Sequence, residues 1–126
     1  MFYFNNNCKP RLRTTVKNIF HDALVKAQQK LPAFTAPDVY CTRSILPPVA
    51  TETVTGSARE SGVIICRILT LKINRNELES FFLHELNHIC HDQLFPVEQN
   101  PTLFDCMLFE GLADTFEQEF KLFPSI

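Results

Sequence analysis

The sequence predicts an α+β fold in which helices cover one face of a short, mostly antiparallel sheet. Residues 12–30, 76–94 and 101–120 carry apolar side chains at helical spacing. Residues 63–73 instead alternate as a strand does, and another strand is expected over residues 38–44. The order helix, short strands, helix, helix is typical of a small antiparallel or mixed sheet with its helices on one side.

The first expected element is the helix over residues 12–30, which Pro32 ends. Its apolar stripe consists of Leu12, Val16, Ile19, Phe20, Ala23, Leu24 and Ala27. The strand over residues 38–44 follows. Residues 51–62 are polar and contain two glycines, so they are expected to form either a short strand or a loop.

Residues 63–73 give the clearest strand pattern in the chain. One side of this strand would carry Ile65, Arg67, Leu69, Leu71 and Ile73, and the other Ile64, Cys66, Ile68, Thr70 and Lys72. Both sets are mostly apolar, which indicates a strand covered on at least one face. Arg67 is expected at a solvated position of that strand.

The next helix is expected over residues 76–94, with Asn74 or Asn76 as its cap and Pro96 just past its end. Its apolar face would consist of Phe82, Leu83, Leu86, Ile89 and Cys90. Its polar face carries His84, Glu85, Asn87 and His88 of the motif His84-Glu85-Leu86-Asn87-His88.

The two histidines of this motif are one helical turn apart, roughly 6 Å along the axis, so both imidazoles can reach one ion. The pattern HExxH on a helix is typical of a zinc site with its own general base. Glu85 stands beside the ligands, where it can take a proton from a metal-bound water. The sequence therefore predicts one Zn²⁺ ion held by His84 and His88, with Glu85 as the catalytic residue.

A catalytic zinc ion usually has three protein ligands, and two residues are candidates for the third. His91 lies on the same helix face, but three imidazoles in a row on a straight helix cannot converge on one ion. Glu110 lies in the helix over residues 101–120, for which Pro101 suits the first turn. Its face also carries Leu103, Cys106 and Met107, and a carboxylate among apolar residues is costly to bury unless it is paired or binds a metal.

Asp114 lies one turn beyond Glu110 on the same face. It is placed to accept a proton from the far ring nitrogen of a liganding histidine, which would fix the tautomer and the ring angle. Cys106 can also approach the metal, although an apolar packing role is the simpler expectation.

With these residues in view, the chain resembles the gluzincin metallopeptidases, and in particular the small minigluzincins and a group of predicted zinc-dependent proteases with an HExxH helix followed by an EGLA segment. The likeness covers about residues 60–120 and rests on His84–His88 and on the segment Glu110–Asp114. It implies a small zincin-like domain in which Asp114 supports His84. It also implies a sheet whose edge strand holds an extended peptide substrate.

One feature departs from that family. Gluzincins often carry a tyrosine or histidine beyond the third ligand to stabilise the oxyanion, and this chain has neither after Glu110, which leaves Tyr40 as a candidate. The alternative function is therefore a latent or catalytically degenerate zincin that serves as a zinc-stabilised binding module. In a self-inhibited enzyme, the apolar tail over residues 120–126 would block the cleft, as a terminal segment can in the minigluzincins.

Composition narrows the setting in which the protein works. The chain has 126 residues and 45% hydrophobic residues, so it is expected to form one globular domain over residues 1–126. A formal net charge of −2 without a basic stripe argues against nucleic acid as a partner. Five cysteines without CxxC spacing, no signal pattern and no membrane-spanning run favour a cytoplasmic protein. The HExxH chemistry and the resemblance to the gluzincins imply a peptide or protein substrate. The oligomeric state is not predicted.

Overall fold

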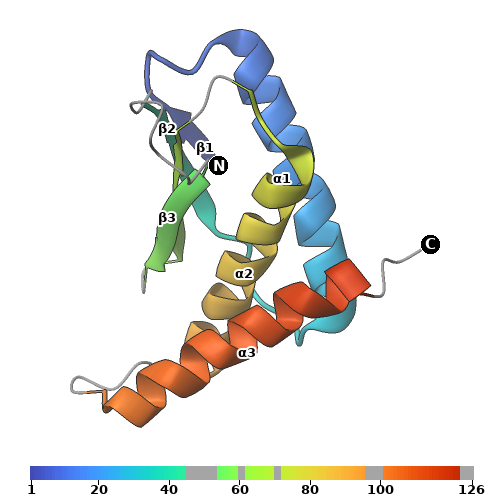
Figure 1. The fold of residues 1–126 in the computed structure, drawn as a ribbon, viewed down its shortest axis with the longest axis vertical. Coiled ribbons are helices and arrows are strands. Elements are labelled where there is room, and N and C mark those ends of the chain that lie inside the picture. The colour runs from blue at the N-terminus through green and yellow to red at the C-terminus, as the bar shows by residue number, and fades with distance from the viewer. Residues whose placement is uncertain (45–53, 60–61, 70–71, 96–100, 123–126) are drawn as a thin grey trace.

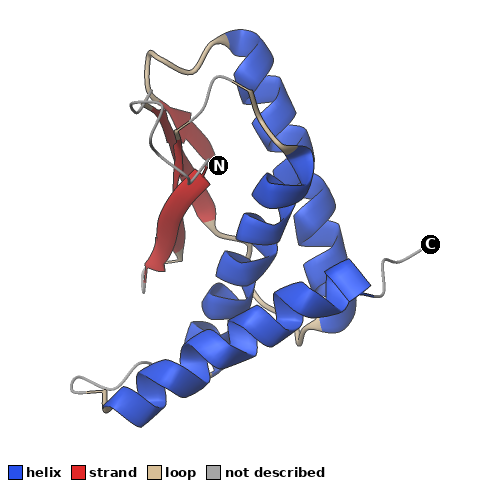
Figure 2. Ribbon diagram, in the orientation of Figure 1, coloured by secondary structure: helices blue, strands red, loops and turns tan. Residues whose placement is uncertain are grey.

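The computed structural model describes residues 1–44, 54–59, 62–69, 72–95 and 101–122. Its elements are β1 (Phe2–Phe4), α1 (Pro10–Lys30), β2 (Asp38–Arg43), β3 (Val54–Arg59), β4 (Val63–Ile68), α2 (Arg75–Leu94) and α3 (Leu103–Leu122). Figure 1 shows a small sheet on one side and the three helices on the other. The same division is clear by colour in Figure 2. The α+β class with helices on one face of the sheet is therefore confirmed.

The sheet has the strand order β1-β2-β4-β3 and is mixed. β1 pairs with β2 and β2 pairs with β4 in parallel, whereas β3 and β4 are antiparallel. The expectation of a mostly antiparallel sheet is therefore wrong. β1 and β2 are parallel because α1 connects them and returns the chain to the end of the sheet at which β1 starts. β4 then enters between β2 and β3, which leaves β3 at an edge.

Two strands differ from the sequence expectation. β1 was not expected, because three residues are too few to show a strand period. β4 ends at Ile68 rather than at Ile73, although its faces are as expected: Ile64, Cys66 and Ile68 are buried. Arg67 is exposed, as expected for a solvated position.

The segment left open between strand and loop contains β3, while residues 51–53 and 60–61 lie outside the described residues. Gly56 lets β3 approach its neighbours closely. A Cβ atom placed there would stand 1.8 Å from the carbonyl oxygen of Ile65 and 3.0 Å from the ring of Phe81. Gly62, at the start of the return into β4, has φ +76°, a conformation that favours glycine.

The core lies between the sheet and the helices α1 and α2. The sheet contributes Val39, Cys41, Ile64, Cys66 and Ile68, and α1 contributes Leu12, Val16, Ile19, Phe20, Ala23 and Ala27. The expected apolar face of α2 is buried throughout. Asn74 caps α2, since its side-chain oxygen accepts from the backbone N–H groups of Asn76 and Glu77. This burial turns the opposite face of α2 outward.

α3 begins two residues later than the sequence indicated, at Leu103 instead of Pro101. Thr102 and Asp105 form reciprocal hydrogen bonds of 2.9 and 3.1 Å across the helix start, so Thr102 is the cap and Pro101 precedes the helix. Ala113 and Phe116 anchor the later half of α3 in buried positions. The earlier half is exposed, including Leu103, Phe104, Met107 and Leu108. In Figure 1, α3 crosses α2.

Candidate metal centre

Helix α2 places His84 and His88 side by side on its outward face. Their Nε2 atoms are 3.1 Å apart, and the rings stand nearly perpendicular at 83°. The two side chains are 17% and 5% exposed, so both rings lie mostly out of water. Neighbours at i and i+4 on a helix converge in this way only when both side chains point to a common location.

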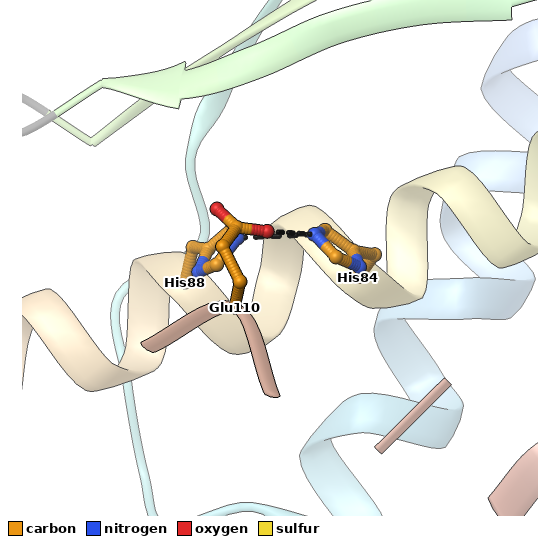
Figure 3. Close-up of side chains that lie close together, drawn as sticks. All are labelled: His84, His88 and Glu110. Atoms are coloured by element: carbon orange, nitrogen blue, oxygen red, sulfur yellow. Dashed lines mark hydrogen bonds and ion pairs between the residues drawn. The ribbon is translucent and has the colours of Figure 1, made fainter. Parts of the chain in front are cut away.

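Glu110 reaches the same location from α3. Its Oε2 lies 3.1 Å from Nε2 of His84, and its Oε1 lies 3.2 Å from Nε2 of His88. Figure 3 shows the carboxylate facing both rings, with β3 passing above them. The Glu110 side chain is 59% exposed, so its apolar neighbours do not bury it as expected. Leu103 and Met107, which share its face, are 77% and 64% exposed.

The donor set fits a zinc ion. Tetrahedral zinc with bonds of about 2.0–2.2 Å sets its ligand atoms roughly 3.3–3.6 Å apart. The Nε2 atoms of the two histidines are 3.1 Å apart, and each faces a different oxygen of Glu110, at 3.1 Å from His84 and 3.2 Å from His88. Nδ1 of His84 faces carboxylates, and if it carries the proton, then Nε2 presents a lone pair to the Glu110 carboxylate. Two acceptors at this distance require a cation or a proton between them.

The far nitrogen of His84 faces two carboxylates of α3. Nδ1 is 3.1 Å from Oδ1 of Asp114 and 3.4 Å from Oε2 of Glu117. A carboxylate at Nδ1 keeps the proton there and leaves Nε2 free to bind a metal. His84, Asp114 and Glu117 also form a second group of mutually close donor atoms.

His88 is held differently. Its ring stacks on Phe109 of α3, with centroids 4.0 Å apart and an interplanar angle of 23°. Its Nδ1 is buried and has no hydrogen-bond partner among the residues that the structure describes. Burial, partly opposed by Glu110, lowers the pKa of His88 to about 4, so its ring is neutral at physiological pH. A neutral imidazole is the form that binds a metal.

Glu85 points inward from the same helix and is only 6% exposed. Burial raises its pKa to about 7, against the opposing effect of the His84 ring and of a hydrogen bond from the backbone N–H of Ala58 in β3. Its Oε2 has no hydrogen-bond partner in the described part of the chain. A carboxyl group with a pKa near neutrality can both accept and release a proton at physiological pH.

A family model matches residues 20–122, and its family is described as "Predicted Zn-dependent protease (DUF2268)". The chain belongs to this family. No curated protein and no solved structure matched the chain. The matched segment contains both histidines, Glu85 and the whole of α3. Within the described residues of this family member, no helix is long and apolar enough to cross a membrane.

The structure brings together four of the residues that the sequence nominated for the metal centre of this zinc-protease family member. His84, His88 and Glu110 form one group of close donor atoms, and Asp114 contacts His84. Their roles as ligands and as a supporting residue stay predictions, as does the catalytic role of Glu85.

Three other candidates do not join the group. His91, the alternative third ligand, packs its ring against Phe95 and Phe109 instead. Cys106 is exposed, so the expected apolar packing role is wrong, whereas the other four cysteines are buried. Tyr40 stacks on Tyr3 at 4.5 Å. It lies on the sheet face opposite the helices, because its neighbours Val39 and Cys41 are the residues that enter the core, so Tyr40 is no candidate for the oxyanion.

Sequence reasoning missed three contributors to the site: Glu117, Phe109 and Ala58. Glu117 lies seven residues after Glu110 and therefore shares its helix face, a signal that the sequence did contain. Phe109 gave no comparable signal, because aromatic residues are frequent throughout this helix. The backbone N–H of Ala58 cannot be found from residue types at all, since it depends on how β3 lies against α2.

Proposed function

We propose that this family member is a zinc metalloendopeptidase of the gluzincin type, with a peptide or protein as its substrate. The observation that carries this proposal is the convergence of His84, His88 and Glu110 from two helices within 3.1–3.2 Å of one another. Glu85 stands next to them in the motif and has the burial and the pKa that a general base requires. Membership in a family of predicted zinc-dependent proteases supports the same assignment.

In the proposed enzyme, His84, His88 and Glu110 would hold one Zn²⁺ ion. Zinc, when bound, would supply a Lewis acid that lowers the pKa of coordinated water and polarises a carbonyl group. The chain itself orients these ligands: carboxylates of α3 face His84, and Phe109 stacks on His88. The partial exposure of Glu110 leaves one side of the group open to substrate and water.

Glu85 moves the proton in this mechanism. Its carboxylate accepts a proton from the attacking water and passes it to the amine that leaves when the peptide bond breaks. Two features support this role. The group is shielded from bulk water, and its pKa of about 7 makes both transfers accessible near neutral pH.

The edge strand β3 is the proposed binding place for the substrate backbone. It lies at one end of the strand order, and its Ala58 donates a hydrogen bond to Glu85, so it runs directly beside the base. An unpaired strand edge can accept an extended peptide through backbone hydrogen bonds. The resemblance to the gluzincins implies the same use of the edge strand.

Replacement of the base tests the proposal. In Glu85→Gln, hydrolysis of a casein-type substrate should fall by about 10²- to 10⁴-fold, because the amide cannot accept the proton. The zinc content, measured by elemental analysis of the purified protein, should stay near one ion per chain. His84→Ala is the matched control and should lose both zinc and hydrolysis. Parent-level hydrolysis by the Gln variant would show that Glu85 is not the base.

The alternative function, a latent or catalytically degenerate zincin that serves as a zinc-stabilised binding module, is supported by a missing oxyanion-stabilising residue. After Glu110, the described part of α3 contains no tyrosine or histidine that can stabilise an oxyanion. The tail expected to block the cleft begins at Phe120, which packs against the hydrophobic core, and residues 123–126 lie outside the described residues. Hydrolysis that appears only after removal of residues 122–126 would support latency, and equal hydrolysis with and without the tail would contradict it.

The domain organisation, the cellular location and the partners of the protein are likewise proposed from its sequence. We propose a single domain over residues 1–126 that works in the cytoplasm and binds neither nucleic acid nor a membrane. The formal net charge of −2 and the absence of a basic stripe support the part that concerns nucleic acid.

A further inference from the structure

We propose that Glu117 is a second positioning residue for His84, which acts together with Asp114 on the Nδ1 atom. The sequence pattern assigned this role to Asp114 alone. Because Glu117 acts through a zinc ligand, the inference rests on the proposed function. It deepens that function by assigning the support of one ligand to a pair of carboxylates.

The geometry places both carboxylates at one nitrogen. Oδ1 of Asp114 is 3.1 Å from Nδ1 of His84, and Oε2 of Glu117 is 3.4 Å away. Nδ1 carries at most one hydrogen, so the two acceptors share or exchange a single N–H donor. Either acceptor alone is enough to keep the proton on Nδ1 and the lone pair on Nε2, which faces Glu110.

Burial distinguishes the two acceptors. The side chain of Asp114 is 66% exposed, so water competes for its oxygens and screens its charge. The side chain of Glu117 is 19% exposed, where a hydrogen bond to a carboxylate is less weakened by water. Glu117 therefore compensates for its longer distance with a more protected environment.

The attachment of α3 to the core also supports a role for Glu117. Glu117 directly follows Phe116, which is 6% exposed and belongs to the hydrophobic core, and it lies four residues after the fully buried Ala113. This part of α3 is thus fixed against the body of the protein. Glu110 lies in the less buried half of the helix, so Glu117 links His84 to the part of α3 with the firmer attachment.

The test compares Glu117→Gln, Asp114→Asn and the double variant with the control Glu119→Gln. Glu119 has the same chemistry, lies on the same helix and is exposed. Zinc affinity is measured by competition with a chromophoric chelator. Loss of a partner of a liganding histidine typically lowers metal affinity about 10- to 100-fold. We expect a loss of that order for Glu117→Gln, a larger loss for the double variant and no change for Glu119→Gln.

A second readout does not depend on zinc. The ¹⁵N chemical shifts of the His84 ring in the metal-free protein report which nitrogen carries the hydrogen. We expect Nδ1–H in the parent, in Glu119→Gln and in Asp114→Asn, which keeps Glu117 as an acceptor, and a mixed or reversed tautomer only in the double variant. If the role of Glu117 were merely structural, Asp114→Asn would already show the same tautomer mixture as the double variant.

The possible outcomes distinguish a failure of the role of Glu117 from a failure of the proposed zinc site. Parent-like zinc affinity in Glu117→Gln, with equal tautomer mixtures in Asp114→Asn and the double variant, while His84→Ala loses zinc, would overturn the role of Glu117 and leave the metal site standing. A parent protein that binds no zinc at all would overturn the proposed function and the role of Glu117 together.

Discussion

At the scale of single residues, Glu85 and His88 have opposite responses to the same burial. Glu85 is 6% exposed and His88 is 4% exposed, and in each case desolvation disfavours the charged form. The carboxyl group is therefore shifted toward its protonated form and the imidazole toward its neutral form. Both shifts favour the proposed site, since a general base works best near its pKa and a ligand must be unprotonated.

These shifts predict how the stability of the metal-free protein depends on pH. The pKa of Glu85 is raised from 4.5 to about 7, so its contribution to the free energy of unfolding is fully present below pH 4.5 and is lost as pH rises to about 7. The pKa of His88 is lowered from 6.5 to about 4, so its contribution is present above pH 6.5 and is lost as pH falls to about 4. The two groups therefore change the free energy of unfolding in opposite directions over nearly the same pH interval.

In Glu85→Gln, the pH dependence of the free energy of unfolding that His88 causes should therefore become visible. In the metal-free variant, the free energy of unfolding should rise from pH 4 to pH 6.5. The variant should also exceed the parent by an amount that grows above pH 4.5 and reaches about 1–3 kcal/mol near pH 7.5. Urea unfolding in the presence of a chelator, at several pH values, measures both. A variant no more stable than the parent at pH 7.5 would show that burial of the Glu85 carboxylate carries no such cost.

The two histidines proposed as ligands, His84 and His88, are positioned by different interactions although they lie on one helix. His84 faces carboxylates at Nδ1, whereas His88 stacks on Phe109 with its Nδ1 buried. A charged hydrogen bond fixes a tautomer and a direction, but stacking fixes only the ring plane. The tautomer of His88 is consequently set by the groups at its Nε2, which include Glu110 and His84.

At the scale of elements, β3 joins the sheet to the site. Gly56 allows this strand to lie close to β4 and to Phe81 of α2, and Ala58, two residues on, reaches Glu85. The position of the base therefore depends on a close backbone approach that only a residue without a Cβ atom permits.

Two glycine variants test this dependence. Gly56→Ala would place a Cβ atom 1.8 Å from a backbone oxygen, so we expect a loss of stability of about 1–3 kcal/mol or more together with reduced hydrolysis. Gly111→Ala, in α3, meets nothing within 4 Å and should stabilise the protein by about 0.5–1 kcal/mol, because alanine is the better helix former. Thermal unfolding of both variants measures the contrast. Equal stability of the two would show that β3 can shift at no cost.

At the scale of the whole molecule, the site connects the hydrophobic core of the protein with the exposed first half of α3. Sheet, α1 and α2 share one hydrophobic core, to which α3 adds Phe116 among the buried residues. The half of α3 before Ala113 exposes Leu103, Phe104 and Met107 at 64–77%. Few buried contacts there imply a low local stability. The contacts of Glu110 with the histidines are the polar link between this half and α2.

Zinc should therefore stabilise the protein and protect α3 most. A ligand that binds only the folded state adds about 2.7 kcal/mol when its free concentration is 100 times its dissociation constant. We expect removal of zinc by a chelator to lower the melting temperature. Amide hydrogen exchange should become faster in residues 103–112, with little change in α1. Identical melting and exchange with and without zinc would contradict a metal bridge between α2 and α3.

The sequence by itself determined the helices, the class of fold and four of the residues that meet at the site, His84, His88, Glu110 and Asp114. Helical periodicity is a local property, so it placed the apolar face of α2 in the core and the histidines of the HExxH pattern on the opposite face. The segment Glu110–Asp114 supplied its two carboxylates in the same way, since residues four apart share a helix face.

Only the tertiary structure decided the rest. The parallel pairing of β1 with β2 depends on the path of the chain through α1, and that of β2 with β4 depends on the insertion of β4 between β2 and β3; no local pattern records either. The exposure of Glu110, the support of His84 by Glu117 and the hydrogen bond from Ala58 to Glu85 depend on how α3 and β3 lie against α2. Contacts between segments far apart in the chain are set by packing, and packing has no period in the sequence.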